Sequence, residues 1–323
     1  MNVTFIIGNG LDMSLGMQTS YKQFYAYVGK VKPKTRNQIY TAISNDPDTW
    51  SDFELALGAH TQNFEMLYGD QRQKAIDKFR RAFDEVIDDL GDYLQEQRND
   101  SIGKLPFYIM SSNDFYSGLH GESSRKISNI IGDQPLEMNF VTLNYTDTLE
   151  NLLYPERHSM KQRGVIIKRI HHAHGELSDY ITMGVSNESQ ISATLTGDSR
   201  DDFIKPLLLA SMDDDRLNTT EDIIENSSII IIYGTSFGKT DEYIWQRIVN
   251  WLGGADSRFV IIHDFNEDFL LKPTRNPSRI KQLDNEARNR LLDHIEHLSD
   301  NEKVTLRSKI LVVRNTTKLF VGQ

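Results

Sequence analysis

The chain has 323 residues, 38% of them hydrophobic and 25% charged, a length and balance that allow a substantial buried core. It contains no cysteine, which excludes disulfides, thiol nucleophiles and cysteine-ligated zinc. Its net charge of −10 argues against a general nucleic-acid binder, because neutralising phosphates requires clustered Lys and Arg.

The first predicted element is a short buried strand at residues 3–7, whose apolar run stops at Gly8 and predicts a tight loop. Residues from about 25 to 135 are then predicted to form a mainly helical insertion or subdomain. Its clearest helix carries an apolar face made by Ile76, Phe79, Phe83, Ile87, Leu90 and Leu94. We assign this helix a packing role and no chemistry.

Further strands are predicted in the second half of the chain, each made of a short apolar run. They lie at residues 140–143, 165–167, 228–233, 259–262 and 310–313. The third of these is apolar throughout, as a central strand covered on both faces should be. Strands that alternate with helices predict an α/β fold of the Rossmann-like kind, a mostly parallel sheet flanked by helices within one domain over residues 1–323.

No apolar run approaches the length of a membrane span, and the first residues show no basic leader followed by a signal core. We therefore expect a cytoplasmic protein with no membrane partner. The acidic charge is expected to keep it soluble and does not describe its ligand.

Several predicted strands end in small or polar residues, and these strand ends are where a ligand is expected. In open parallel sheets, ligands bind beyond the carboxyl ends of the strands, near the point where the strand order reverses. The candidate segments are Gly8-Asn9-Gly10, Asn144-Tyr145-Thr146, His174-Gly175 and Gly234-Thr235-Ser236.

The loop after the first strand is a candidate phosphate-facing segment. Its glycines would let backbone amides approach a phosphate, and the next helix would add its positive end. Asp12 could cap that helix or accept hydrogen bonds from ribose hydroxyls. A tight strand-to-helix turn without a ligand is the alternative.

Asn144 and His174 are the candidates for chemistry. An Asn side chain both donates and accepts, which suits ribose hydroxyls or an attacking water, although a turn residue is the commoner use. The histidines at 171, 172 and 174 suggest a metal, but no further ligand is evident, so no metal is expected. His174 better fits a general base, with a core histidine satisfied by hydrogen bonds as the alternative.

The loop after the most apolar strand, Gly234 to Gly238, could line a phosphate or ribose, with Asp241 as a cap for the next helix. Ser236 also has the spacing of a Gly-x-Ser-x-Gly nucleophile. An esterase with His263 and Asp264 as partners is therefore a distant alternative.

Taken together and in order, these segments resemble the AbiH family of bacterial phage abortive-infection proteins. The resemblance covers most of the chain and is weakest at about 60–135 and after 265. It implies an antiphage effector that responds to a phage trigger or a partner defence protein. The matching segments are residues 5–12, 16–21 with Phe24, Trp50-Ser-Asp-Phe-Glu54, Thr142-Leu-Asn-Tyr-Thr146, His174-Gly175 and 233–241.

The same landmarks resemble a sirtuin-like NAD-binding core, which implies catalytic roles for Asn144 and His174 and NAD as substrate or ligand. Without the four zinc-binding cysteines of sirtuin deacylases, deacylation is not expected. Sirtuins have an alanine where this chain has Asn9, and related defence NADases often have Asp where it has Thr146. The residues expected around the nucleotide are Gly8, Asn9, Gly10, Asp12, Thr19, Tyr21, Tyr145, Gly234, Thr235, Ser236 and Asp241.

The resulting prediction is an abortive-infection effector that hydrolyses NAD at the nicotinamide–ribose bond, a NAD+ glycohydrolase. The alternative is a non-catalytic nucleotide-binding sensor or toxin subunit that acts through a partner protein. Nuclease action is disfavoured by the charge and by the lack of a compact carboxylate cluster for metal. NAD, NADP and other nucleotides are not distinguished, and a homo-oligomer remains open.

Overall fold

The computed structural model describes residues 1–32, 36–98, 114–265 and 274–314. Six parallel strands form one sheet in the order β3-β2-β1-β4-β5-β6, which is the order of dinucleotide-binding Rossmann sheets. The predicted α/β Rossmann-like fold class is confirmed. The strands are β1 Asn2–Ile7, β2 Leu136–Thr142, β3 Val165–His172, β4 Ile229–Tyr233, β5 Phe259–Asp264 and β6 Ile310–Arg314.

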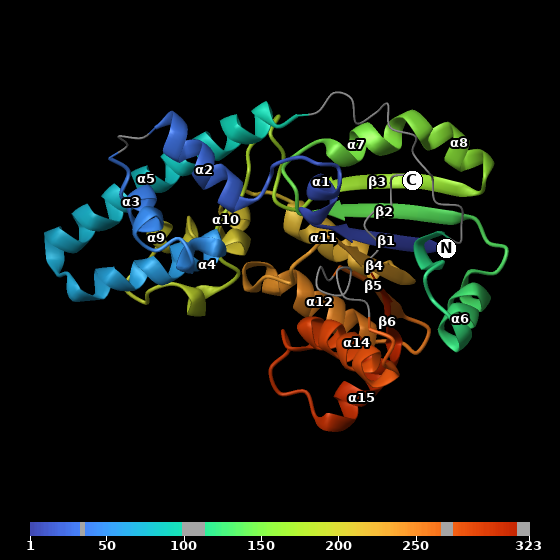
Figure 1. Ribbon diagram of the computed structural model, residues 1–323. Coiled ribbons are helices and arrows are strands. Elements are labelled where there is room, and N and C mark those ends of the chain that lie inside the picture. The colour runs from blue at the N-terminus through green and yellow to red at the C-terminus, as the bar shows by residue number, and fades with distance from the viewer. Residues whose placement is uncertain (33–35, 99–113, 266–273, 315–323) are drawn as a thin grey trace.

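Helices cover both faces of the sheet (Figure 1). Successive side chains of a strand point to opposite faces, so neighbours such as Phe5 and Ile6 enter different cores. The first face packs against α6 Gly121–Ile131, α7 Thr148–Leu153 and α8 Arg157–Gln162. The second packs against α11 Arg216–Glu225, α12 Glu242–Gly253, α14 Pro277–Leu292 and α15 Asp300–Lys309.

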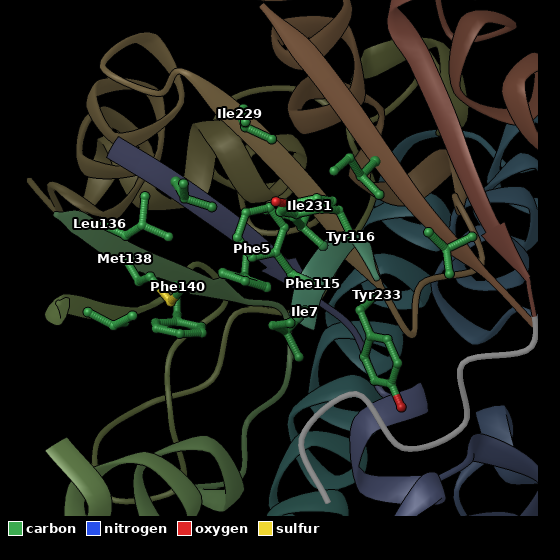
Figure 2. Packing of buried hydrophobic residues seen from close by; sticks show 14 of the residues in the cluster. Phe5, Ile7, Phe115, Tyr116, Leu136, Met138, Phe140, Ile229, Ile231 and Tyr233 are labelled. Atoms are coloured by element: carbon green, nitrogen blue, oxygen red, sulfur yellow. The ribbon is translucent and has the colours of Figure 1, made fainter. Parts of the chain in front are cut away.

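The core on the first face is built around aromatic rings (Figure 2). Phe5 stacks on Phe140 with ring centroids 4.9 Å apart and meets Phe115 edge-on at 6.0 Å. Phe115 belongs to the 3-10 turn η4 Asp114–Tyr116. The end of the predicted helical insertion, from η4 through α6, therefore packs on the sheet.

A separate layer of helices lies beyond the carboxyl ends of the strands (Figure 1). This helical layer has its own core, in which Phe53, Phe79 and Phe203 are buried. Phe203 comes from the connection between β3 and β4, so two distant parts of the chain build the layer. Its helices are α2 Tyr21–Val31, α3 Gln38–Asn45, α4 Phe53–His60, α5 Gly69–Glu96, α9 Asp198–Asp201 and α10 Lys205–Ser211.

The remaining elements are short. They are helix α1 Gly10–Ser14 and the 3-10 turns η1 Thr49–Ser51, η2 Thr61–Met66, η5 Tyr154–Glu156, η6 Glu188–Gln190 and η7 Lys239–Asp241. Within the described ranges, no helix combines the length and apolar character that crossing a membrane would require.

Candidate functional site

A cavity of about 920 Å³ lies at the carboxyl ends of the strands, where the order of the sheet reverses between β1 and β4. Strand-end loops form one side of it, and the helical layer forms the other. The structure brings every predicted site residue to its lining, whereas their roles toward a nucleotide stay a prediction. These residues are Gly8, Asn9, Gly10, Asp12, Thr19, Tyr21, Asn144, Tyr145, His174, Gly234, Thr235, Ser236 and Asp241.

The glycine loop after β1 packs tightly against the loop after β4. The Gly8 amide donates to the Tyr233 carbonyl at 2.9 Å, and the Gly10 amide donates to the Gly234 carbonyl at 2.8 Å. A Cβ added to Gly10 would lie only 2.5 Å from Gly234 Cα. These glycines therefore let two loops touch, and the amides of Gly8 and Gly10 are already used within the protein.

Gly10→Ala is expected to destabilise the protein by about 1–3 kcal/mol, because the new methyl group must push two backbone segments apart. Gly29→Ala in α2 is the matched control, since a Cβ there meets nothing within 4 Å, and it should be neutral or stabilising. Urea unfolding of both variants measures the difference. Equal stability of the two variants would contradict the proposed loop contact.

The loop after β4 leaves its backbone amides open. Among the described residues, no carbonyl or side chain accepts a hydrogen bond from the N–H groups of residues 235–238. Phe237 has a φ of +57°, in the left-handed region, while its ring packs on Trp245 at 5.1 Å. Successive open amides in such a turn form a concavity suited to an anion. This loop therefore offers more to a phosphate than the glycine loop after β1 does.

Asn9 and Thr19 bind each other within the cavity wall. The Asn9 amide Nδ2 donates to the Thr19 carbonyl at 3.0 Å, and the Thr19 hydroxyl donates to Asn9 Oδ1 at 2.5 Å. These bonds close the segment between α1 and α2. Both side chains therefore shape the wall and have few groups left for a ligand.

Asp12 is not a helix cap, because it lies inside α1, whose N-cap is Asn9. Its side chain is buried, and its Oδ2 accepts a hydrogen bond from the Thr146 hydroxyl at 2.7 Å. Burial raises the pKa of Asp12, although the hydrogen bond from Thr146 opposes the shift. Among the described residues, Asp12 Oδ1 has no hydrogen-bond partner. Asp12 lines the cavity, and this buried oxygen keeps an unused capacity to accept a hydrogen bond.

Two histidines at the end of β3 hold the loop that carries Asn144. His172 Nδ1 lies 3.0 Å from the Asn144 carbonyl oxygen, and its Nε2 lies 2.9 Å from Glu150 Oε1. His174 Nδ1 lies 3.2 Å from the Leu143 carbonyl oxygen. Burial alone would lower the pKa of His172, but the Glu150 carboxylate holds it above its ordinary value. The histidines thus fix the backbone on either side of the predicted catalytic amide.

The histidine run does not converge on a common point. His171 Nε2 lies 3.0 Å from both the Arg216 carbonyl oxygen and the Thr220 hydroxyl, away from the partners of His172 and His174. In the part of the chain that the structure describes, no three His, Asp or Glu side chains are grouped to hold a metal ion.

A buried chain of charges lies behind His174. His174 Nε2 is 3.0 Å from Asp241 Oδ1, but the two are not aligned for a good hydrogen bond, so this buried nitrogen has no hydrogen-bond partner among the described residues. Lys205 Nζ donates to Asp241 Oδ1 at 2.7 Å and to Glu54 Oε2 at 3.1 Å. Burial alone would raise the pKa of Asp241, but the charges of Lys205 and His174 hold it well below its ordinary value. Asp241 does occupy the N-cap position of α12, but the expected capping by its side chain is wrong, because its carboxylate makes no capping hydrogen bond.

Sequence reasoning missed several residues of this region. The sequence pattern places Glu54 only within a segment that resembles AbiH proteins. It assigns no role to Lys205, although this residue is fully buried. The position of Lys205 between Ile204 and Pro206 in an apolar stretch was the available sign of burial. Helix α5 does more than pack, since its Leu90 and Leu94 line the cavity.

The serine-hydrolase alternative finds no support in the geometry. Ser236 is exposed, and within the described ranges no hydrogen bond joins it to a histidine. His263 instead directs Nε2 to the Phe115 carbonyl oxygen at 2.9 Å, and burial lowers its pKa to about 4. The left-handed backbone lies at Phe237 and not at the serine.

The fold and the cavity define a Rossmann-type ligand-binding protein, with its site at the switch point of a parallel sheet. The model of one protein family, described as bacteriophage abortive infection AbiH, matches residues 4–263. The chain therefore belongs to the AbiH family, as the sequence segments indicated, and this membership suggests a role in phage abortive infection. A search of curated proteins found no match.

Proposed function

We propose that this protein hydrolyses NAD at the nicotinamide–ribose bond during abortive infection. The observation that carries the proposal is one cavity, at the switch point, lined by Asn144, His174 and Asp12, whose Oδ1 has no hydrogen-bond partner among the described residues. An amide can orient water, an imidazole can act as a general base, and a carboxylate can stabilise the positive charge that this cleavage creates.

The reaction would place each group where its chemistry is used. The bond from ribose C1′ to the nicotinamide nitrogen breaks, and its electron pair leaves with neutral nicotinamide. Positive charge then develops on the sugar, where the Asp12 carboxylate can stabilise it. Asn144 orients the attacking water, and His174 takes the proton that the water loses. The products are ADP-ribose, nicotinamide and a proton.

The rest of the cavity supports a dinucleotide. Its volume of about 920 Å³ lies in the upper part of the usual range for cofactor sites, about 300–1,000 Å³. The open amides of residues 235–238 offer donors for a pyrophosphate, and Lys239 follows them directly. These donors make the loop after β4 the expected place of the phosphates.

The test is nicotinamide release from NAD by the purified full chain, followed by chromatography, together with the melting temperature with and without NAD. Release and a raised melting temperature are expected. A raised melting temperature without release would instead favour the nucleotide sensor. Neither release nor a shift would overturn the assignment of NAD to this cavity.

A further inference from the structure

A continuous chain of buried charged side chains connects the helical layer to His174. Glu54 comes from α4, Lys205 from the start of α10 and Asp241 from η7, just before α12. Neighbouring backbone groups hold this row of charged side chains in place at Glu54 and Lys205. The Gly184 amide donates to Glu54 Oε1 at 3.0 Å, and the Lys205 amide donates to the Val185 carbonyl at 2.9 Å.

The three side chains Glu54, Lys205 and Asp241 together carry more negative than positive charge. One ammonium, at Lys205, lies between the carboxylates of Glu54 and Asp241, with the side chain of Lys205 fully buried, that of Glu54 9% exposed and that of Asp241 15% exposed. Uncompensated charge is costly in such a place. The Nε2 atom of His174 lies against this excess negative charge, 3.0 Å from Asp241 Oδ1. A proton taken up by His174 would therefore balance the cluster.

We propose that Lys205 and Glu54 are positioning residues that act on His174 through Asp241, an inference that rests on the proposed function for its catalytic meaning. Lys205 donates to Asp241 Oδ1, so the carboxylate stays charged and fixed beside the imidazole without forming a hydrogen bond to Nε2. Glu54 in turn fixes Lys205. Through Glu54, the docking of the helical layer reaches the histidine, which gives this layer a direct route to control the site.

Several elements packed around Glu54, Lys205 and Asp241 contribute charged or titratable groups near His174. The negative charge of Glu54 stabilises the protonated imidazole of His174, and the positive charge of Lys205 destabilises it. Removing either charge should therefore have opposite effects on the protonation of His174. The charged and titratable groups in this setting are Asp52, Glu54, Tyr145, Lys205, Asp241 and Tyr243.

The test compares Glu54→Gln with Lys205→Met. Removing the carboxylate should move the titration of His174 to lower pH, and removing the ammonium should move it to higher pH, each on the order of half a pH unit. The primary readout is NMR titration of His174 in protein labelled at histidine, assigned with His174→Ala. The acid limb of kcat/KM for NAD cleavage should shift in the same two directions.

Surface charges provide the control. Lys168 and Glu137 form an exposed pair on β3 and β2, so Lys168→Met and Glu137→Gln should leave the titration of His174 in place. Shifts in the same direction for Glu54→Gln and Lys205→Met, or no shift in either, would overturn the proposal. If Lys205→Met does not fold, the isosteric Glu54→Gln decides alone by the direction of its shift. Because NMR needs no turnover, opposite shifts in a protein that leaves NAD intact would uphold the coupling and count only against the proposed function.

Discussion

His174→Ala is expected to lower the rate of nicotinamide release by about 10²–10⁴-fold, the usual contribution of a general base. Nε2 is the ring nitrogen without a hydrogen-bond partner among the described residues, since Nδ1 faces the Leu143 carbonyl oxygen. Removing the ring therefore removes the group that we propose as acceptor of the proton of the attacking water. The amides of residues 235–238, which we propose for the phosphates, are untouched by the change. NAD should consequently still raise the melting temperature of the variant.

Asn144→Ala should reduce the rate in the same way, because the water loses the side chain that orients it. His158→Ala is the matched control for both variants, since His158 is exposed on α8, outside the cavity lining. It should keep full activity. The measurement is single-turnover nicotinamide release, with NAD binding followed separately by melting temperature. Loss of binding together with activity, or unchanged activity in His174→Ala, would contradict the assigned roles.

The strands and the position of the site were predictable because both follow from local patterns. A run of consecutive apolar residues such as Ile229–Tyr233, rich in β-branched side chains, predicts a buried strand, and Gly234 marks its end. Parallel strands all end at one edge, so small and polar residues that follow them meet there. This is why Asn144 and Gly10, which are far apart in sequence, line one cavity.

The buried ion pairs of Lys205 with Glu54 and Asp241 were not predictable, because they join residues far apart in sequence. Glu54 and Lys205 are 151 positions apart, and Lys205 and Asp241 are 36 apart. Nothing within either local segment indicates the partner. Asp241 illustrates the error that results: a carboxylate before a helix is usually a cap, but here the ammonium of Lys205 attracts it more strongly than the helix amides do.

Lys205→Met is expected to give the largest loss of stability, about 3–5 kcal/mol at neutral pH, because it leaves the carboxylates of Glu54 and Asp241 buried without a counter-charge. Adding Glu54→Gln should recover part of the loss, since only one uncompensated carboxylate then remains. Lys168→Met, at an exposed ion pair, should cost less than about 1 kcal/mol and serves as the control. Urea unfolding of the four proteins measures these differences.

The dependence of this loss on pH separates lost charge pairing from lost packing. In the natural protein the pKa of Asp241 is lowered, so its contribution to stability is present above the unfolded value of about 3.9 and is lost as the pH falls further. Without Lys205, burial should instead raise this pKa above the unfolded value, and protonation then stabilises the variant as the pH falls. The gap between the two proteins should therefore narrow from pH 7 toward pH 5. A gap of constant size would show that Lys205 contributes through the packing of its side chain, and its charge would then have no part in holding Asp241.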